Sequence, residues 1–242
     1  PVLAGERYER LPLIIAGGHA TFNPQPLADF VDAFVIGDGE EAVVEVVSAY
    51  QEVRGEPREV QLRALARIAG VYVPRFYEER YHADRTVAAI EPDVPEAPFP
   101  VLKRVVSPLP PPPTRLLVPN VDVTHNRATV EIQRGCTRGC RFCHAGMVVR
   151  PVRERPVEEV LAAIEAILRQ TGFEEVGLLS LSSSDYSGIE RLVRAIMERF
   201  GGAHLSISLP AVLACRFSVA HAEACAQWRD TDVLLTAVVC RE

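Results

Sequence analysis

Short apolar runs alternate with amphipathic stretches near the start of the chain. The first run, residues 13–16, ends at a pair of glycines, and a second covers residues 33–36. Each run has the length of a buried strand. Helical spacing of apolar residues predicts helices over residues 26–31 and 40–50, and the second has two glutamates in its first turn, where the helix dipole favours negative charge. Strands that alternate with helices predict a parallel α/β layer.

The same alternation returns from residue 129. A strand leads into a cysteine-rich loop, and a helix that starts at Pro156 and ends before Gly172 follows, with residue types suited to both ends. A second helix opens at Ser187, three residues before a glutamate, which is the spacing of a capping box. This order predicts consecutive βα units of a barrel or an open parallel sheet. The three strands are predicted over residues 129–133, 176–181 and 204–209.

The segment between these two regions, residues 70–128, is irregular and rich in proline. Proline cannot donate a hydrogen bond to a strand ladder, so we interpret the segment as a stiff linker or extended segment rather than as a ligand for an SH3-type domain. It separates a first α/β domain over residues 1–69 from a second over residues 129–210. Residues 211–242 lose the βα pattern, and a shifted reading frame would explain this atypical tail.

Composition and charge narrow the class of protein. The chain has 242 residues, 48% of them hydrophobic, which is enough for a sizeable core. A net charge of -6 argues against nonspecific binding to nucleic acid or to an anionic membrane. No apolar run reaches the roughly 20 residues that a membrane span needs, and the first residues carry no secretory pattern. We expect a soluble cytoplasmic protein, and because the chain begins at Pro1 and reaches an apolar run at once, a fragment.

Three of the six cysteines lie within eight residues, at Cys136, Cys140 and Cys143. Such crowding is typical of metal ligation rather than of disulfides. The loop follows a predicted strand, where α/β folds build their sites, and Gly135 and Gly139 allow it to curl so that the sulfurs face one centre. The other three cysteines are predicted to be ordinary core residues: Cys215, Cys225 and Cys240.

Three thiolates are compatible with two kinds of metal site. Bound to a four-iron cluster, they leave the fourth iron open for a small molecule, whereas a plain electron carrier usually fills all four positions with cysteine. A structural zinc ion needs four ligands, and His144 is available as the fourth. In that alternative the chain is an α/β interaction module that presents a zinc loop to a partner.

The spacing C-x3-C-x2-C, with Phe142 before the last cysteine, resembles the signature of the radical S-adenosylmethionine (SAM) superfamily. Residues 140–155 and, upstream, residues 16–20 and 36–41 are similar to a bacterial family that joins a cobalamin-binding-type domain to a radical SAM core. The resemblance implies an α/β fold: the C-terminal part of a flavodoxin-like cobalamin-binding-type domain, followed by the first βα units of a partial TIM-like radical SAM barrel.

The resemblance also implies a function. Cys136, Cys140 and Cys143 would hold a [4Fe-4S] cluster, which reductively cleaves SAM to a 5′-deoxyadenosyl radical that acts on an unknown substrate. A one-electron reductant such as flavodoxin or ferredoxin is the implied partner. An Asp-x-His-x-x-Gly motif, whose histidine ligates cobalt in such domains, does not occur in the sequence, so cobalamin is not expected in this chain.

SAM contacts follow from the same resemblance. Phe142 lies where the family places an aromatic residue near the adenine, with simple core packing as the alternative. Much of the superfamily ends its second strand with a Gly-Gly-Glu-like motif, and here Ser183 and Asp185 stand in that region. They are predicted to replace it, or else to start a helix. Arg150, Arg153 and Arg155 would neutralise a carboxylate near the cluster or form a solvated basic loop.

Overall fold

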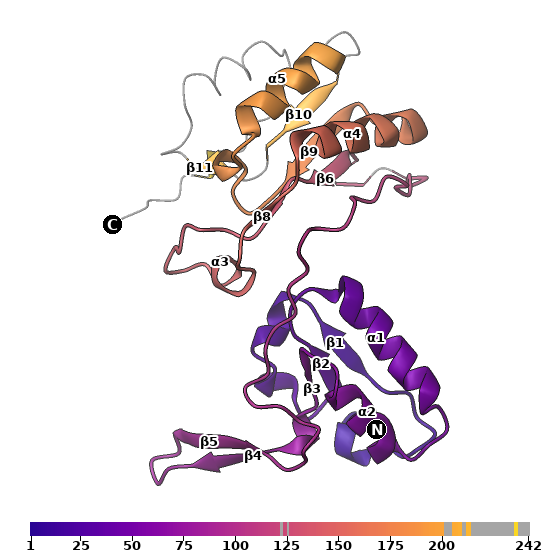
Figure 1. Ribbon diagram of the computed structural model, residues 1–242, viewed down its shortest axis with the longest axis vertical. Coiled ribbons are helices and arrows are strands. Elements are labelled where there is room, and N and C mark those ends of the chain that lie inside the picture. Colours follow the sequence, from indigo (N-terminus) through magenta and orange to yellow (C-terminus); the bar gives the residue numbers. More distant parts are fainter. Residues whose placement is uncertain (122, 125, 201–204, 210–211, 214–234, 237–242) are drawn as a thin grey trace. The chain divides into compact units, whose positions relative to one another are not determined.

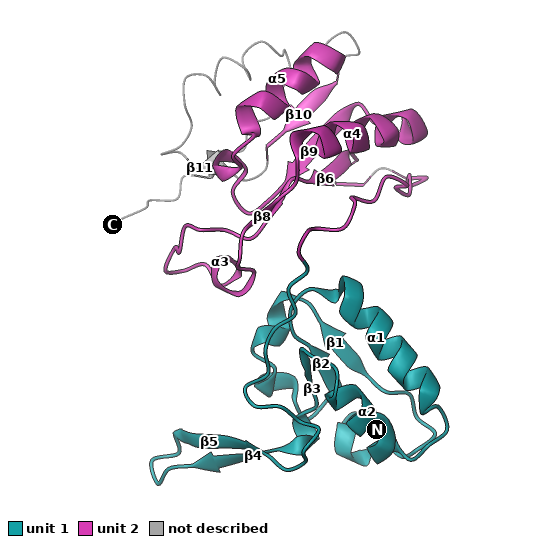
Figure 2. Cartoon of the chain, in the orientation of Figure 1, with its two compact units in different colours: residues 1–106 teal, residues 107–242 magenta. Residues whose placement is uncertain are grey.

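The computed structural model describes residues 1–121, 123–124, 126–200, 205–209, 212–213 and 235–236. The chain divides into two compact units, Pro1–Val106 and Ser107–Glu242 (Figure 2). In the described ranges, no helix is both long enough and apolar enough to cross a membrane.

Unit 1 is built on a three-stranded sheet in the order β1-β2-β3 (Figure 1). Strand β1 (Ile15–Gly17) is parallel to β2 (Ala33–Val35), and β3 (Val71–Tyr72) is antiparallel to β2. Helices α1 (Gly39–Glu52) and α2 (Arg58–Ala66) supply buried residues to the same core as the sheet. The central strand β2 is buried along its whole length, as expected for a continuous apolar run.

The strands β1 and β2 and the helix α1 confirm the predicted parallel α/β layer. The helix predicted over residues 26–31 is wrong: only a short 3-10 turn forms there, η3 (Gln25–Leu27), with proline in its first turn. Helix α2 was not predicted, because Arg58 and Gln61 occupy buried positions on it and weaken the apolar period. The remaining 3-10 turns of unit 1 are η1 (Ala4–Glu6), η2 (His19–Phe22) and η4 (Pro74–Phe76).

The predicted linker boundary at residue 70 differs from the structure. Strand β3 completes the sheet, and β4 (Tyr77–Tyr81) with β5 (Val87–Pro92) forms an antiparallel hairpin. Further on, the Arg104 backbone N–H donates to the Ile36 carbonyl at 2.8 Å. Unit 1 therefore extends to Val106. The two-residue strand β3 is too short to show a period, and its partner lies far away in the sequence.

Unit 2 contains a parallel sheet in the order β10-β9-β6, formed by β6 (Ala128–Glu131), β9 (Glu175–Leu179) and β10 (Ser206–Ser208). Helices α4 (Val157–Thr171) and α5 (Ile189–Phe200) connect the strands. Consecutive strands are neighbours, which confirms the predicted run of βα units. Within the described ranges the sheet is open rather than closed into a barrel. A second pair, β11 (Val212–Leu213) with β12 (Leu235–Thr236), is also parallel.

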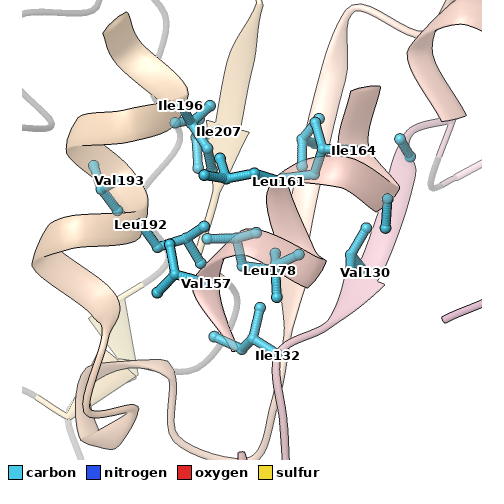
Figure 3. Close-up of a cluster of buried hydrophobic side chains, with 14 of the residues drawn as sticks. Val130, Ile132, Val157, Leu161, Ile164, Leu178, Leu192, Val193, Ile196 and Ile207 are labelled. Carbon is cyan, nitrogen blue, oxygen red and sulfur yellow. The ribbon is translucent and has the colours of Figure 1, made fainter. Parts of the chain in front are cut away.

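The main hydrophobic core of unit 2 lies between this sheet and helices α4 and α5 (Figure 3). Alternate residues of each strand, such as Val130, Leu178 and Ile207, point into it and are buried. Gly172 adopts a left-handed conformation with φ 69° and closes α4, as predicted. The predicted tail over residues 211–242 lies almost entirely outside the described residues. So do three cysteines assigned there to the core: Cys215, Cys225 and Cys240.

A buried charge cluster stabilises unit 1. One Oδ of Asp32 accepts from Arg7 Nη1 at 2.8 Å and from the Ile14 backbone at 2.8 Å, and the other lies 2.8 Å from Arg58 Nη2. The three charged side chains are at most 4% exposed. Removing one partner of a buried ion pair leaves an uncompensated charge in a poorly solvated place.

We predict that Asp32→Ala lowers the free energy of unfolding of unit 1 by about 3–5 kcal/mol, because two guanidinium groups lose their counter-charge. Urea titration followed by hydrogen–deuterium exchange mass spectrometry measures the two units separately. Glu59→Gln is the control, since the exposed Arg63–Glu59 pair should contribute less than about 0.5 kcal/mol. Equal effects of the two substitutions would show that the buried cluster is not important for stability.

Candidate metal centre

The three clustered cysteines lie in a loop that leaves the carboxyl end of β6. Strand β7 (Gln133–Arg134) pairs with β8 (Arg153–Glu154) in antiparallel fashion, so the two ends of the loop are held side by side. The loop contains one turn of helix, α3 (Ala145–Val148) (Figure 1). Because β6 and β9 are parallel, the loop emerges at the same edge of the sheet as the segment after β9.

Glycine sets the course of the loop backbone. Gly135 has φ 96°, and a Cβ there would lie 2.7 Å from the Pro151 carbonyl oxygen and 3.0 Å from the Val149 carbonyl oxygen. Gly139 also has a positive φ, 63°. A side chain at residue 135 would therefore be both strained and in collision with the returning end of the loop. The positive φ values agree with the predicted curl of the loop, but the three sulfurs do not yet face one centre in the described part of the chain.

All three thiols of the loop are free. Cys136 is buried, and Cys140 and Cys143 are half-buried and share one turn, in which the Cys143 N–H donates to the Cys140 carbonyl at 2.9 Å. Two sulfurs accept backbone hydrogen bonds: Cys136 Sγ from Arg138 at 3.5 Å, and Cys143 Sγ from Gly146 at 3.3 Å. Hydrogen bonds to the sulfur ligands tune the reduction potential of a bound cluster.

The donor set of this loop fits three irons of a [4Fe-4S] cluster, since soft thiolates are the ligands that such clusters take. Among the residues the structure describes, no three Cys, His, Asp or Glu side chains are arranged to hold a metal ion. Convergence of the three sulfurs on one centre would thus accompany metal binding, as is common where ligands come from a single loop. His144, the fourth ligand of the zinc alternative, is exposed and precedes α3.

The segment after β9 forms the facing part of the site and contains η5 (Ser183–Asp185). The Ser183 side chain is fully buried; its hydroxyl lies 2.9 Å from Ser180 Oγ and donates to the Leu178 carbonyl at 3.3 Å. Asp185 instead reaches the cysteine loop, where its carboxylate accepts two hydrogen bonds from Arg138. Of the two residues in this segment that were predicted to contact SAM, only Asp185 reaches the cysteine loop.

Phe142 is 74% exposed, so core packing, the alternative prediction for this ring, is wrong. Its ring lies on the surface of the cysteine loop, between two of the candidate ligands in the sequence. The exposed aromatic face is available for stacking with a flat ligand. Exposure of an apolar ring to water is unfavourable, and a stacked ligand would cover it.

Two of the basic residues after the loop are buried rather than solvated. Arg153 donates to the Val149 carbonyl at 3.3 Å, inside the loop. Arg155 is 4% exposed, pairs with Glu159 at 2.8 Å and lies 3.6 Å from Glu131, the last residue of β6. From the sequence, Glu131 was not singled out as a partner of these basic residues. Its position, at the end of a strand shortly before the cysteine motif, could have pointed to it.

A buried tyrosine anchors the segment after β9 to the segment that follows β8. Tyr186 is 3% exposed and donates its hydroxyl to the Arg155 carbonyl at 2.7 Å. Burial, and secondly the negative charge of Glu154, raise the pKa of Tyr186 to about 12. The phenol therefore stays neutral and keeps its hydrogen-bond donor at physiological pH, so the residue next to Asp185 is rigidly placed.

Comparison with known families gives two matches along the chain. Residues 1–74 match the N-terminal domain of radical SAM proteins, and residues 130–230 match the radical SAM superfamily. The second match contains Cys136, Cys140 and Cys143 and continues beyond residue 210, the predicted end of the resemblance. The protein MJ0966 of Methanocaldococcus jannaschii is 24% identical over 200 residues, which cover 81% of this chain and 37% of that protein.

Solved structures of the radical SAM methyltransferase TsrM from Kitasatospora setae share the fold. The form with cobalamin and a [4Fe-4S] cluster bound has a TM-score of 0.53 at 17% identity, covering 88% of this chain and 40% of TsrM. The form with tryptophan substrate and the SAM analogue aza-SAM bound has a TM-score of 0.51 at 16% identity, and the match covers 88% of this chain and 39% of TsrM. The chain thus spans about two fifths of the length of these proteins. With both family matches in sequence order, the chain belongs to the radical SAM superfamily and carries the N-terminal domain of radical SAM proteins ahead of the superfamily core.

Proposed function

We propose that this chain binds a [4Fe-4S] cluster through Cys136, Cys140 and Cys143 and takes part in the reductive cleavage of SAM to a 5′-deoxyadenosyl radical. The observation that carries the proposal is the loop itself. Three free thiols lie at the carboxyl edge of a parallel sheet, and the glycine at residue 135 permits a backbone course that other residue types adopt only with strain and a close contact. The cluster, when bound, supplies the electron that breaks the sulfonium bond of SAM.

The chain's own residues hold and shield the centre. Cys136 comes from the buried base of the loop, and its carbonyl oxygen accepts from Arg150 Nε at 3.3 Å. Cys140 and Cys143 are nearer to solvent, on the side where SAM would enter. Three protein ligands leave one iron open, which is what distinguishes SAM chemistry from plain electron transfer.

SAM contacts are proposed for the exposed side of the loop. The open face of Phe142 suits stacking on the adenine. Ser183 and Asp185 were predicted to bind SAM as well, but the hydroxyl of Ser183 is already bonded inside the fold. Its geometry favours support of the segment after β9 over direct contact with the ligand.

The proposals for cobalamin and for the redox partner come from the family resemblance. The TsrM structure that this chain resembles contains cobalamin, which is compatible with a cobalamin-binding-type origin of unit 1. The Asp-x-His-x-x-Gly motif does not occur in this sequence, so we propose no cobalt ligand from this chain. A small one-electron reductant such as flavodoxin or ferredoxin is the proposed partner.

We predict that alanine at Cys136, Cys140 or Cys143 strongly lowers the iron and sulfide bound after anaerobic reconstitution, because each substitution removes one ligand from the cluster. Alanine at Cys215, Cys225 or Cys240 is the matched control and should leave both contents almost unchanged. Iron and sulfide per chain, and 5′-deoxyadenosine by chromatography, are the measurements. Equal iron loss from both groups of cysteines would overturn the assignment.

His144→Ala separates the cluster from the zinc alternative. In our proposal SAM rather than histidine occupies the fourth position, so the variant should keep its iron. In a zinc site the same substitution removes a ligand and should lower the metal content. The measurement is elemental analysis after anaerobic purification. Zinc in place of iron in the unaltered chain, or loss of metal from His144→Ala, would favour the interaction module.

Gly135→Ala should lower the amount of cluster bound, because its Cβ collides with the Pro151 carbonyl and the positive φ costs about 1–2 kcal/mol. Gly55→Ala is a matched control, since Gly55 has φ 95° and no atom lies within 4 Å of the position that a Cβ would take there. The measurement is the iron bound per chain after reconstitution of the Gly135→Ala and Gly55→Ala variants. Equal iron in Gly135→Ala and the unaltered chain would show that the loop tolerates another course.

A further inference from the structure

We infer, resting on the proposed function, that Arg138 and Asp185 form a clamp that positions the cysteine loop for cluster binding. In this role Asp185 is a positioning residue that acts through Arg138 rather than a direct ligand of SAM. The pair joins two segments 47 residues apart, one from each of two neighbouring parallel strands.

The geometry of the clamp is that of a strong ion pair. Arg138 Nε donates to Asp185 Oδ2 at 2.6 Å, and Arg138 Nη2 donates to Oδ1, so the planar guanidinium meets both carboxylate oxygens. Ser182 Oγ adds a third hydrogen bond to Oδ2 at 2.7 Å. The side chains are only 24% and 13% exposed, so water screens the pair less than it screens a surface contact.

One end of the clamp is fixed by the core of unit 2. Asp185 is followed by the buried Tyr186 and lies two residues after the fully buried Ser183, and the hydroxyls of both residues donate to backbone carbonyls elsewhere in the fold. Asp185 is therefore a rigid point at the edge of the sheet.

The other end lies inside the metal-binding motif. Arg138 stands midway between Cys136 and Cys140, and its own backbone N–H points to Cys136 Sγ at 3.5 Å. Holding its side chain restrains the backbone on both sides, and so restrains two of the three ligands. A loop restrained before metal binding loses less conformational entropy when the ligands converge.

The clamp and a direct SAM contact predict different patterns of substitution. If Asp185 acts through Arg138, then Arg138→Gln and Asp185→Asn have the same effect, and the double substitution adds nothing. If Asp185 contacts SAM directly, Arg138→Gln leaves that contact in place. Glu158→Gln is the matched control, because it breaks an exposed Arg191–Glu158 ion pair between α4 and α5, away from the cysteines.

The experiment measures the alkylation rate of each loop cysteine by iodoacetamide in the full, cluster-free chain, with site-resolved mass spectrometry. We expect each single variant and the double variant to be alkylated roughly tenfold faster at Cys136 and Cys140, the factor given by a coupling of about 1.4 kcal/mol. Glu158→Gln should match the unaltered chain, and Arg138→Lys, which keeps the charge but not the two-point contact, should lie between. Far-UV circular dichroism checks that the fold of each variant is intact.

Two outcomes overturn the clamp: unchanged alkylation in Arg138→Gln, or a double variant markedly faster than either single variant. Reconstituted samples supply the second measurement, in which the same three variants should bind less iron than Glu158→Gln. Failure of the proposed function has a different signature, zinc or no metal in the unaltered chain, and leaves the alkylation pattern intact.

Discussion

Burial of one face of the β6-β9-β10 sheet against α4 and α5 is the interaction on which the site depends. The alternate apolar side chains of the three strands are withdrawn from water beneath α4 and α5 (Figure 3). Because each helix follows one strand and returns the chain to the start of the next, the three strands run in the same direction. Their carboxyl ends then meet at one edge, and the cysteine loop and the segment that carries Asp185 emerge beside one another there. The metal-binding motif is thus placed by a core that contains none of its ligands.

Charge is used for different purposes in the two units. In unit 1 the cluster of Arg7, Asp32 and Arg58 is buried and tied to backbone groups, so it fixes the packing of the sheet. In unit 2 the Arg138–Asp185 pair is partly exposed and lies between a fixed segment and a loop. A pair in that position restrains the loop while leaving room for the loop to adjust around a metal.

The sequence was sufficient where a local pattern determines the structure. Apolar period placed β1, β2, β6, α1 and α4, and spacing alone singled out the cysteines, because both signals lie within a few neighbouring residues. Prediction from the sequence failed where the contacting residues lie far apart in the chain or where an element departs from the usual apolar pattern. Helix α2 buries polar side chains, β3 is two residues long, and the bond from Arg138 to Asp185 spans 47 residues. The burial of Ser183 likewise depends on packing that no motif records.

The most direct test of the central claim is the electron paramagnetic resonance spectrum of the reduced, anaerobically reconstituted chain, recorded with and without SAM. Three cysteine ligands and an open iron predict a [4Fe-4S] signal whose shape changes when SAM is added, since SAM then coordinates the open position. A signal that SAM leaves unchanged would indicate a fully ligated cluster, and a silent, colourless protein that contains zinc would contradict the account outright.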